Sequence, residues 1–250
     1  MSRVVSTIVG QRGNQHPSQE NISFSHLESF DKRLVDPKPD LYYGARPEQI
    51  DERVRDELGK YIVPSSDTTL PAVPNFFPEG KSIKGRTDTA RRQACHDGAA
   101  GARAMHQLQN YRASTPVYDG NAYTITSTYH DYKLNMYATH PTEPKVPGGR
   151  PEYHMTLLYS ISMEFSADSF RVGAEAYRNA RDLAKEYRDR LIANANEVAQ
   201  RRSAEPASFS TTTNRRNSLF TTAGTDSAES DTSVDELAID HGTNSKRPRR

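Results

Sequence analysis

The stretch Val73-Pro74-Asn75-Phe76-Phe77-Pro78-Glu79-Gly80-Lys81 decides how this chain folds, because an apolar segment runs directly into charged residues. Its bulky apolar residues predict a short strand. Pro78 cannot donate to a strand ladder, so we expect it on an edge strand or at a bulge. Glu79 and Lys81 are two residues apart, and on a strand that spacing places both side chains on one face.

The segments on either side of this strand predict a second carboxylate beside it and a helix after it. Upstream, Pro37 and Pro39 mark a turn, and Leu41-Tyr42-Tyr43 predicts a strand that starts at Asp40. Downstream, Thr87 or Asp88 can cap a helix that runs to about residue 110. The small residues of that helix permit close approach to a sheet.

The remaining pattern predicts one α/β domain with a mixed central sheet. Turn signals and alternating residues predict a hairpin, and the spacing of apolar residues predicts amphipathic helices. The further elements we expect are a short strand at 22–27, a helix at 47–60, hairpin strands at 122–129 and 133–139, a strand at 153–165, and a long helix at 166–196. We therefore predict a flexible segment at 1–21, a domain at 22–197 and a disordered Ser/Thr-rich tail at 198–250.

Composition narrows the class of protein. Of 250 residues only 34% are apolar, which is low for a chain that is folded throughout. The single Cys95 excludes a disulfide framework and fits a reducing compartment. The first residues are too short and broken to form a secretory signal, and no run approaches about 20 apolar residues. We expect a nuclear or cytoplasmic protein that is not secreted and does not bind a membrane.

Asp40, Glu79 and Lys81 together suggest phosphate chemistry assisted by Mg²⁺. Mg²⁺ prefers hard oxygen ligands and needs only one or two carboxylates beside water and substrate phosphate. Asp40 and Glu79 are candidate metal ligands, with the Gly80 carbonyl as a third, and Lys81 and Gln93 are candidates for positioning the attacking water. The alternative is that Asp40 closes a turn while Glu79 and Lys81 form an exposed pair.

A basic segment follows the candidate site, although the net charge of the chain is only +1. Between residues 81 and 103 six cations face only two carboxylates, Asp88 and Asp97. The cations that we expect to contact a nucleic-acid phosphate backbone are Lys84, Arg86, Arg91 and Arg92. The alternative for such a run is a solvated helix face.

Four segments of the chain carry a family resemblance. They are 36–48 (Asp-Pro-Lys-Pro-Asp-Leu-Tyr-Tyr-Gly-Ala-Arg-Pro-Glu), 74–81, 92–99 (Arg-Gln-Ala-Cys-His-Asp-Gly-Ala) and 118–123 (Tyr-Asp-Gly-Asn-Ala-Tyr). Over residues 22 to 197 the chain resembles a fungal family of uncharacterised proteins, which is similar to the PD-(D/E)XK superfamily of restriction-endonuclease-like nucleases.

This resemblance implies a mixed sheet flanked by helices, with Asp40, Glu79 and Lys81 in the active-site positions and Gln93 on the following helix. It implies Mg²⁺-dependent hydrolysis of nucleic-acid phosphodiesters. Gly80 in the middle of E-x-K, and Asp97 where related nucleases favour Tyr, are departures from the family pattern. They leave open a catalytically inactive nuclease-fold module that binds nucleic acid or a protein partner.

The tail contains two short signals. Lys246-Arg247-Pro248-Arg249-Arg250 resembles a basic peptide that is read by a nuclear import receptor, and the alternative is simply a basic disordered end. Arg215-Arg216-Asn217-Ser218 resembles a basophilic-kinase site, so Ser218 is a candidate for phosphorylation.

Overall fold

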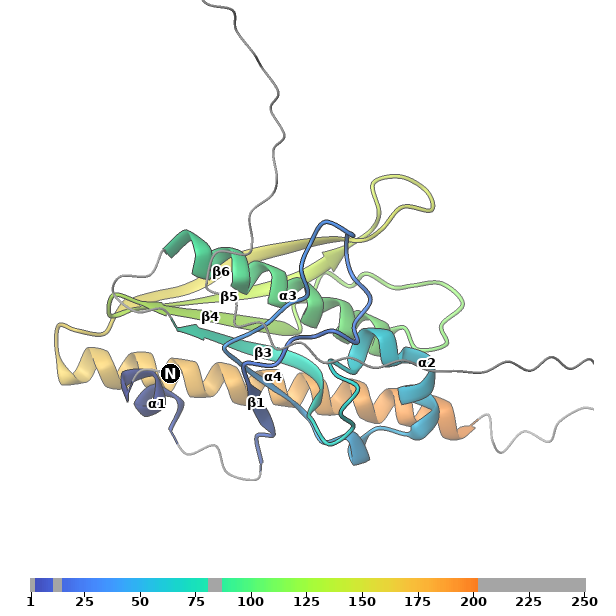
Figure 1. Ribbon diagram of the computed structural model, residues 1–250, viewed down its shortest axis with the longest axis horizontal. Coiled ribbons are helices and arrows are strands. Elements are labelled where there is room, and N and C mark those ends of the chain that lie inside the picture. The colour runs from blue at the N-terminus through green and yellow to red at the C-terminus, as the bar shows by residue number, and fades with distance from the viewer. Residues whose placement is uncertain (1–2, 11–14, 81–86, 202–250) are drawn as a thin grey trace, which may run out of the picture.

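A computed structural model of the protein describes residues 3–10, 15–80 and 87–201, and Figure 1 shows their arrangement. A mixed sheet forms the centre, with the longest helix running along one face. The elements are α1 (Arg3–Val9), β1 (Ser18–Glu20), β2 (Leu41–Ala45), a 3₁₀ turn at Pro47–Gln49, α2 (Glu52–Ile62), β3 (Ala72–Gly80), α3 (Thr87–Gln109), β4 (Thr124–His130), β5 (Lys133–Thr142), β6 (Glu152–Ser162) and α4 (Ala167–Arg201).

The six strands of the sheet are ordered β1-β2-β3-β4-β5-β6, as in the chain. Neighbours are antiparallel except β3 and β4, which run parallel with Phe76 opposite Ile125. A parallel pair needs a crossover, and α3 supplies it. The prediction of a mixed sheet flanked by helices, with a long C-terminal helix, is therefore confirmed.

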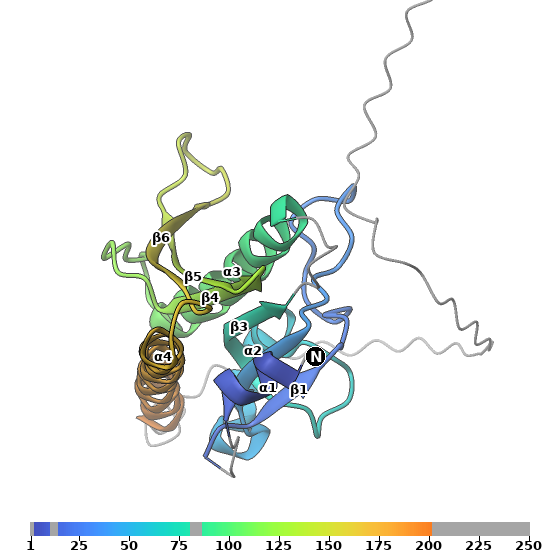
Figure 2. The ribbon, with the colours of Figure 1, turned by 90° about the vertical axis from the view of Figure 1, so that its left-hand side faces the viewer.

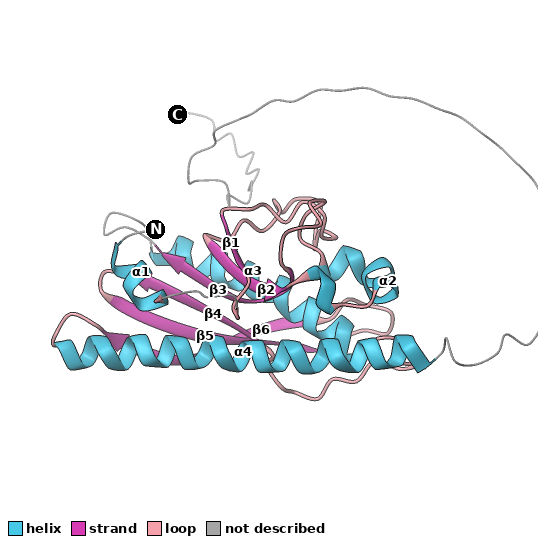
Figure 3. Ribbon diagram, turned by 90° about the horizontal axis from the view of Figure 1, so that it is seen from below, coloured by secondary structure: helices cyan, strands magenta, loops and turns pink. Residues whose placement is uncertain are grey.

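Helices α3 and α4 cover opposite faces of the sheet (Figures 2 and 3). Tyr177 of α4 packs edge-on against Phe76 of β3, with 5.2 Å between ring centroids. On the other face Phe77 packs with Ala100 of α3. Successive residues of a strand point to opposite faces, so the Phe76-Phe77 pair supplies one ring to each layer.

Helix α3 lies unusually close to the sheet because its contacting residues are small. A Cβ on Gly98 would lie 2.6 Å from Thr139 Oγ1, and one on Gly101 would lie 2.7 Å from Phe77 Cε2. Real Cβ atoms do not approach other atoms this closely, so each glycine is required for the contact. The predicted close approach of this helix to a sheet is confirmed.

The N-terminal segment differs from the prediction of a flexible stretch at 1–21. Within its described residues, α1 packs against α4 and β1 adds a strand to the edge of the sheet. Ile8 and Val9 of α1 are buried, and Arg178 and Arg181 of α4 donate to carbonyl groups at the end of that helix. A seven-residue helix is too short to be stable alone, so only these tertiary contacts can hold it, and local sequence could not reveal them.

Three further expectations need correction. Residues 22–27 form no strand; they lie in a loop in which Phe24 is buried. Pro78 lies on neither an edge strand nor a bulge, since β3 is central and Pro78 is opposite Ser127 of β4. The boundary at 197/198 falls inside α4, which continues to Arg201. The remaining tail lies outside the described residues.

The other expected elements are present with shifted bounds: the helix expected from 47 begins at Glu52, after a 3₁₀ turn at Pro47–Gln49, and the strand expected to reach 165 ends at Ser162. The hairpin is present as β4 and β5, and the turn residues Asp131 and Tyr132 both have positive φ angles, of 47° and 59°. That turn geometry matches the right-handed twist of a hairpin. Asp51 caps α2 by accepting from the Arg53 N–H at 3.0 Å.

Candidate active site

Two carboxylates from neighbouring segments meet at one end of the sheet. Asp40 immediately precedes β2, and Glu79 lies near the end of β3. The Asp40 backbone N–H donates to Glu79 Oε1 at 3.0 Å, and the Gly80 N–H donates to Asp40 Oδ2 at 2.9 Å. Continuing the antiparallel register of Tyr43 and Phe76 by three residues also sets Asp40 opposite Glu79. The structure therefore brings these two carboxylates together.

The local sequence explains why side chains join the strands here. Pro78 has no N–H, so at this position β3 cannot donate a ladder bond to either neighbour. The two bonds between backbone and carboxylate groups instead hold Asp40 against residues 79 and 80. Glu79 is 1% exposed and Asp40 is half-buried. The pair therefore has one member inside the fold and one at its rim.

The carboxylates lie at the carboxyl end of the parallel pair β3 and β4. Residues 76 to 80 of β3 are opposite residues 125 to 129 of β4, which places Glu79 opposite Thr128. The carboxyl ends of parallel strands joined by a helix are a common position for ligand sites in α/β sheets. This site is therefore in a position where side chains from several elements converge.

A row of polar side chains continues from Glu79 across the sheet. Thr128 is opposite Asn135 of β5, and Asn135 is opposite Ser160 of β6. Asn135 Nδ2 donates to Thr128 Oγ1 at 3.4 Å, and the Ser160 hydroxyl donates to Asn135 Oδ1 at 2.8 Å. Sequence reasoning missed this row. The alternation of residues along β4 indicates on which face of the sheet Thr128 lies. Only the pairing register of the strands shows that Glu79 and Asn135 are its neighbours.

Gln93 and Asp97 lie in the first half of helix α3, which follows the Glu79 strand. They are one turn apart, and side chains at this spacing lie on the same side of a helix. Asp97 is 2% exposed, and Gln93 is half-buried. Gln93 Oε1 is buried without a hydrogen-bond partner among the residues described. Gln93 thus keeps an acceptor available inside the fold, on the helix that follows the Glu79 strand.

The basic residues separate into two groups. Arg91 and Arg92 are exposed on α3, and Arg92 is 3.8 Å from Asp88 in an exposed ion pair. Arg103, by contrast, is only 8% exposed, so it does not belong to the surface cluster that its sequence position suggested. Its guanidinium lies 4.0 Å from the centroid of the Phe30 ring and donates to the Glu28 carbonyl. Arg103 holds the loop before β2 in place.

Burial around Arg103 shifts the titration of its neighbours. Burial and the Arg103 charge lower the pKa of His96, so this imidazole favours its neutral form. Burial raises the pKa of Tyr153 to about 12, although Arg103 opposes the shift. These two rings flank Phe30, at centroid distances of 6.0 Å and 5.4 Å. The cluster is compact and largely desolvated, which is typical of a structural anchor.

Within residues 3–10, 15–80 and 87–201, no group of three or more His, Cys, Asp or Glu side chains is placed to hold a metal ion. The donor set at the candidate site is thus two carboxylates. That number is sufficient for Mg²⁺, which keeps several water ligands and binds phosphate oxygens.

The match to a known family covers most of this architecture. The model of a domain of unknown function, DUF7924, matches residues 5–216. The chain belongs to this family. The matched region includes the whole sheet, Asp40, Glu79 and all of α4. No curated protein and no solved structure matches the chain.

Several predicted residues lie outside the described residues. They are Lys81, Lys84 and Arg86 between β3 and α3, and Ser218, Lys246, Arg247, Arg249 and Arg250 in the tail. In the part of the chain that is described, no helix is long and apolar enough to cross a lipid bilayer.

Proposed function

We propose that this protein is a nuclease-like phosphodiesterase that uses Mg²⁺ to hydrolyse nucleic-acid phosphodiester bonds. The meeting of Asp40 and Glu79 across β2 and β3 carries the proposal. Two carboxylates that share one position at the end of a sheet are suited to hold a divalent cation against a phosphate. The helix that follows Glu79 and leads into a parallel strand agrees with a restriction-endonuclease-like arrangement.

The donor atoms fit Mg²⁺ better than they fit a softer metal. Asp40 and Glu79 offer carboxylate oxygens, and the Gly80 carbonyl is adjacent. All three are hard ligands, whereas zinc sites in proteins draw mostly on Cys and His. When bound there, Mg²⁺ would polarise the phosphate and lower the pKa of a bound water.

The chain's own residues would then position the reactants. Lys81, two residues after Glu79, would orient the attacking water and stabilise charge that develops on the phosphate. Gln93 has a buried acceptor oxygen on α3, which would fix that water or a neighbouring group. Arg91 and Arg92, exposed near the start of α3, would contact the phosphate backbone, together with Lys84 and Arg86.

One observation favours a second candidate, a catalytically inactive nuclease-fold module that binds nucleic acid or a protein partner. One oxygen of Asp40 and one of Glu79 accept backbone N–H groups that tie β2 to β3. Glu79 is also almost completely buried. Carboxylates that stabilise the fold in this way can persist in a protein that has lost its catalytic activity.

Nicking of a supercoiled plasmid tests both candidates. We expect wild-type protein to nick in Mg²⁺ or Mn²⁺ and to lose this activity in Glu79→Gln and in Lys81→Ala. The control Glu197→Gln changes an exposed carboxylate near the end of α4 and should cut normally. If wild type never cuts but binds DNA in a salt-sensitive way that Arg91→Gln/Arg92→Gln weakens, the inactive module is supported. A protein that neither cuts nor binds DNA would reject the nuclease and the DNA-binding form of the inactive module.

We further propose nuclear import through Lys246, Arg247, Arg249 and Arg250, which would be recognised by an import receptor. Phosphorylation of Ser218 would add negative charge close to Arg215 and Arg216. Replacing the four basic residues with Gln should abolish nuclear accumulation of a fluorescent fusion. An unchanged distribution would reject the import signal.

A further inference from the structure

The two edges of the sheet differ in length and in cover. One edge is the three-residue strand β1, and the other is the eleven-residue strand β6. Within the described part of the chain β6 pairs with β5 alone, so its outer side can accept a further strand. At about 3.4 Å per residue this open edge is about 37 Å long. A long open edge is a template on which another strand can pair.

The sequence of β6 lacks the features that usually prevent such pairing. Between residues 153 and 162 it contains no Asp, Glu, Lys, Arg or Pro. A bulge at Leu158 interrupts its pairing with β5, and bulges can protect an edge. Here, however, Leu157 and Leu158 are 54% and 59% exposed, so the bulge presents apolar side chains rather than charges. A second strand laid along this edge would remove apolar surface from water.

Helix α4 exposes an apolar flank on the same side of the molecule. Both β6 and α4 lie on the side away from α1 and β1 (Figure 2). Val172 and Leu183 of α4 are exposed, and their separation of eleven residues places them on one side of the helix, about three turns apart. The apolar surface of the β6 edge is therefore extended by α4.

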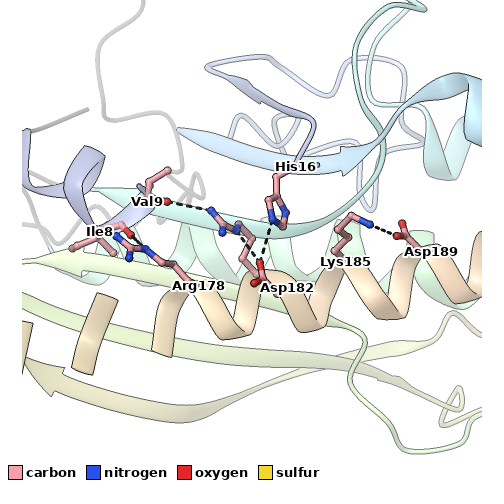
Figure 4. A network of polar contacts seen from close by, with 8 residues as sticks. Ile8, Val9, His16, Arg178, Asp182, Lys185 and Asp189 are labelled. Atoms are coloured by element: carbon pink, nitrogen blue, oxygen red, sulfur yellow. Dashed lines mark hydrogen bonds and ion pairs between the residues drawn. The ribbon is translucent and has the colours of Figure 1, made fainter. Parts of the chain in front are cut away.

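The N-terminal segment already covers the other flank of α4. Arg178 donates to the Ile8 carbonyl at 3.2 Å (Figure 4). At about 100° per residue, Arg178 lies about 100° from the buried Tyr177 in one direction, and Leu183 lies about 120° from it in the other. The chain thus covers one edge of its sheet and one flank of α4 with α1 and β1. Among the described residues, nothing equivalent covers the β6 edge and the Leu183 flank.

Strand β6 is complementary to a second copy of itself. Two antiparallel copies pair over the whole of Glu152–Ser162 only in the register that places Leu157, the central residue, opposite Leu157 of the second copy. Glu152 is then opposite a neutral serine. Two residues beyond the ends of the strand, Arg150 comes opposite Glu164 of the second copy, and both side chains are exposed. Opposite charges therefore meet at both ends of the contact, and like charges meet nowhere along it.

We propose that β6 pairs antiparallel with β6 of a second copy, which makes the protein a two-fold symmetric dimer with one continuous sheet. A band about 10 Å wide along about 37 Å of edge covers roughly 370 Å² of each copy. A stable interface covers about 800 Å² of each partner, so the rest has to come from α4. The flank that carries Val172 and Leu183 packs on the same flank of the second copy, as the symmetry requires.

Sedimentation of the full chain in an analytical ultracentrifuge tests the proposal. We expect a dimer with a Kd below about 10 μM, and a Kd at least tenfold higher for Leu157→Lys, which sets two like charges opposite each other. Leu183→Lys should also weaken the dimer, because it charges the α4 flank. The matched control Val198→Lys changes an exposed valine of the same helix, about 22 Å beyond Leu183, and should leave the Kd unchanged.

Charge reversal and cross-linking test the register. Arg150→Glu and Glu164→Arg each bring like charges together and should weaken the dimer, whereas the double variant should restore it. In a Cys95→Ser background, Leu157→Cys should give a disulfide-linked dimer on mild oxidation. The reason is that opposite Cα atoms of antiparallel strands are about 4.5 to 5.5 Å apart, within the range that a disulfide spans. Val198→Cys in the same background should stay unlinked.

Two outcomes would overturn the proposal. One is a wild type that stays monomeric at about 100 μM, tenfold above the expected limit of the Kd, which would leave the edge to another segment of the chain or to a different protein. The other is a dimer that Leu157→Lys leaves intact and that Leu157→Cys does not cross-link, because that dimer would use another surface. Glu79→Gln should leave the dimer unchanged, so failure of the nuclease proposal would not affect this test.

Discussion

Asp40 and Glu79 are joined by two hydrogen bonds between backbone N–H groups and carboxylate oxygens. The N–H of Asp40 donates to Glu79 Oε1 at 3.0 Å, while the N–H of Gly80 donates to Asp40 Oδ2 at 2.9 Å. Each carboxylate is therefore oriented by an N–H from the segment that carries the other. This cross-linking fixes both side chains before any ligand arrives, which is the preorganisation that a binding site needs.

The first prediction separates the charge of Glu79 from its hydrogen bond. Gln at position 79 still offers an oxygen to the Asp40 N–H, so Glu79→Gln should change the free energy of unfolding by less than about 1 kcal/mol. Losing one carboxylate should weaken Mn²⁺ binding at least tenfold, as measured by calorimetry. Glu197→Gln serves as the exposed control. Equal Mn²⁺ affinity in Glu79→Gln and wild type would contradict a metal role for Glu79.

The second prediction concerns Asn75, which ties three elements together. Its Nδ2 donates to the carbonyl groups of Tyr123 at 2.9 Å and Ala184 at 2.7 Å, and its Oδ1 accepts from Arg188. Asn75→Ala removes all three bonds and leaves a buried guanidinium without this acceptor. We expect a loss of about 3 kcal/mol in the free energy of unfolding, measured in urea.

Asn194→Ala is the matched control for Asn75→Ala, because Asn194 is exposed on α4. That change should stay within about 0.5 kcal/mol of wild type. If the two substitutions cost the same, the hydrogen bonds of Asn75 contribute nothing beyond those that water supplies.

The third prediction contrasts two helical glycines. In α3, a Cβ on Gly101 would lie 2.7 Å from Phe77 Cε2 and 2.9 Å from the Pro74 carbonyl oxygen. Gly101→Ala should therefore push the helix from the sheet and destabilise the fold by about 2 kcal/mol. In α2, the nearest atom to a Cβ on Gly59 is His26 Cε1 at 3.8 Å. Gly59→Ala should raise stability by about 0.5 to 1 kcal/mol through helix propensity.

Chemical denaturation of both glycine variants gives the comparison directly, because the substitution is the same in each. The expected signs are opposite. A Gly101→Ala protein as stable as wild type would mean that α3 can move away from β3 at little cost.

The parts of the fold that could be predicted are those set by local pattern. Alternation and turn residues identify the β4–β5 hairpin, the apolar stripe identifies α2, and Thr87 or Asp88 marks the start of α3. The Asp51 cap of α2 is missed, because Pro47 suggests an earlier helix start. The meeting of Asp40 with Glu79 could be predicted, because the short segment of sequence around each residue marks it as a candidate metal ligand. Their proximity needed only the assumption that the two strands are neighbours.

The parts that could not be predicted depend on contacts between distant segments. Helix α1 is held by the packing of Ile8 and Val9 and by hydrogen bonds from arginines of α4, and its seven residues do not signal these contacts. The sequence predicts that Pro78 lies on an edge strand or at a bulge. It lies instead in the central strand β3, where hydrogen bonds to side chains take the place of ladder bonds. The burial of Arg188 is equally invisible locally, since a cation on an amphipathic helix is normally solvated.

The last prediction is a loss of stability on acidification, caused by buried histidines. Burial is the main reason why the pKa values of His96 and His106 are lowered, and the His106 ring stacks on Tyr118 at 4.6 Å. The unfolded chain then binds more protons than the folded one once the pH falls below the ordinary histidine value of about 6.5. Stability should therefore be fully present above about pH 7 and decline as the pH falls through 6.5 toward 5.

His106→Gln tests this origin because it removes one titrating group and keeps a polar side chain. The difference in unfolding free energy between variant and wild type, measured in urea at a series of pH values, should be constant above pH 7 and shift in favour of the variant toward pH 5. The reason is that at low pH the folded wild type must either protonate the desolvated imidazole of His106 or keep it neutral at a cost in free energy. Gln does not titrate and has neither cost. A difference that stays constant over the whole range would show that His106 is not responsible for the acid sensitivity.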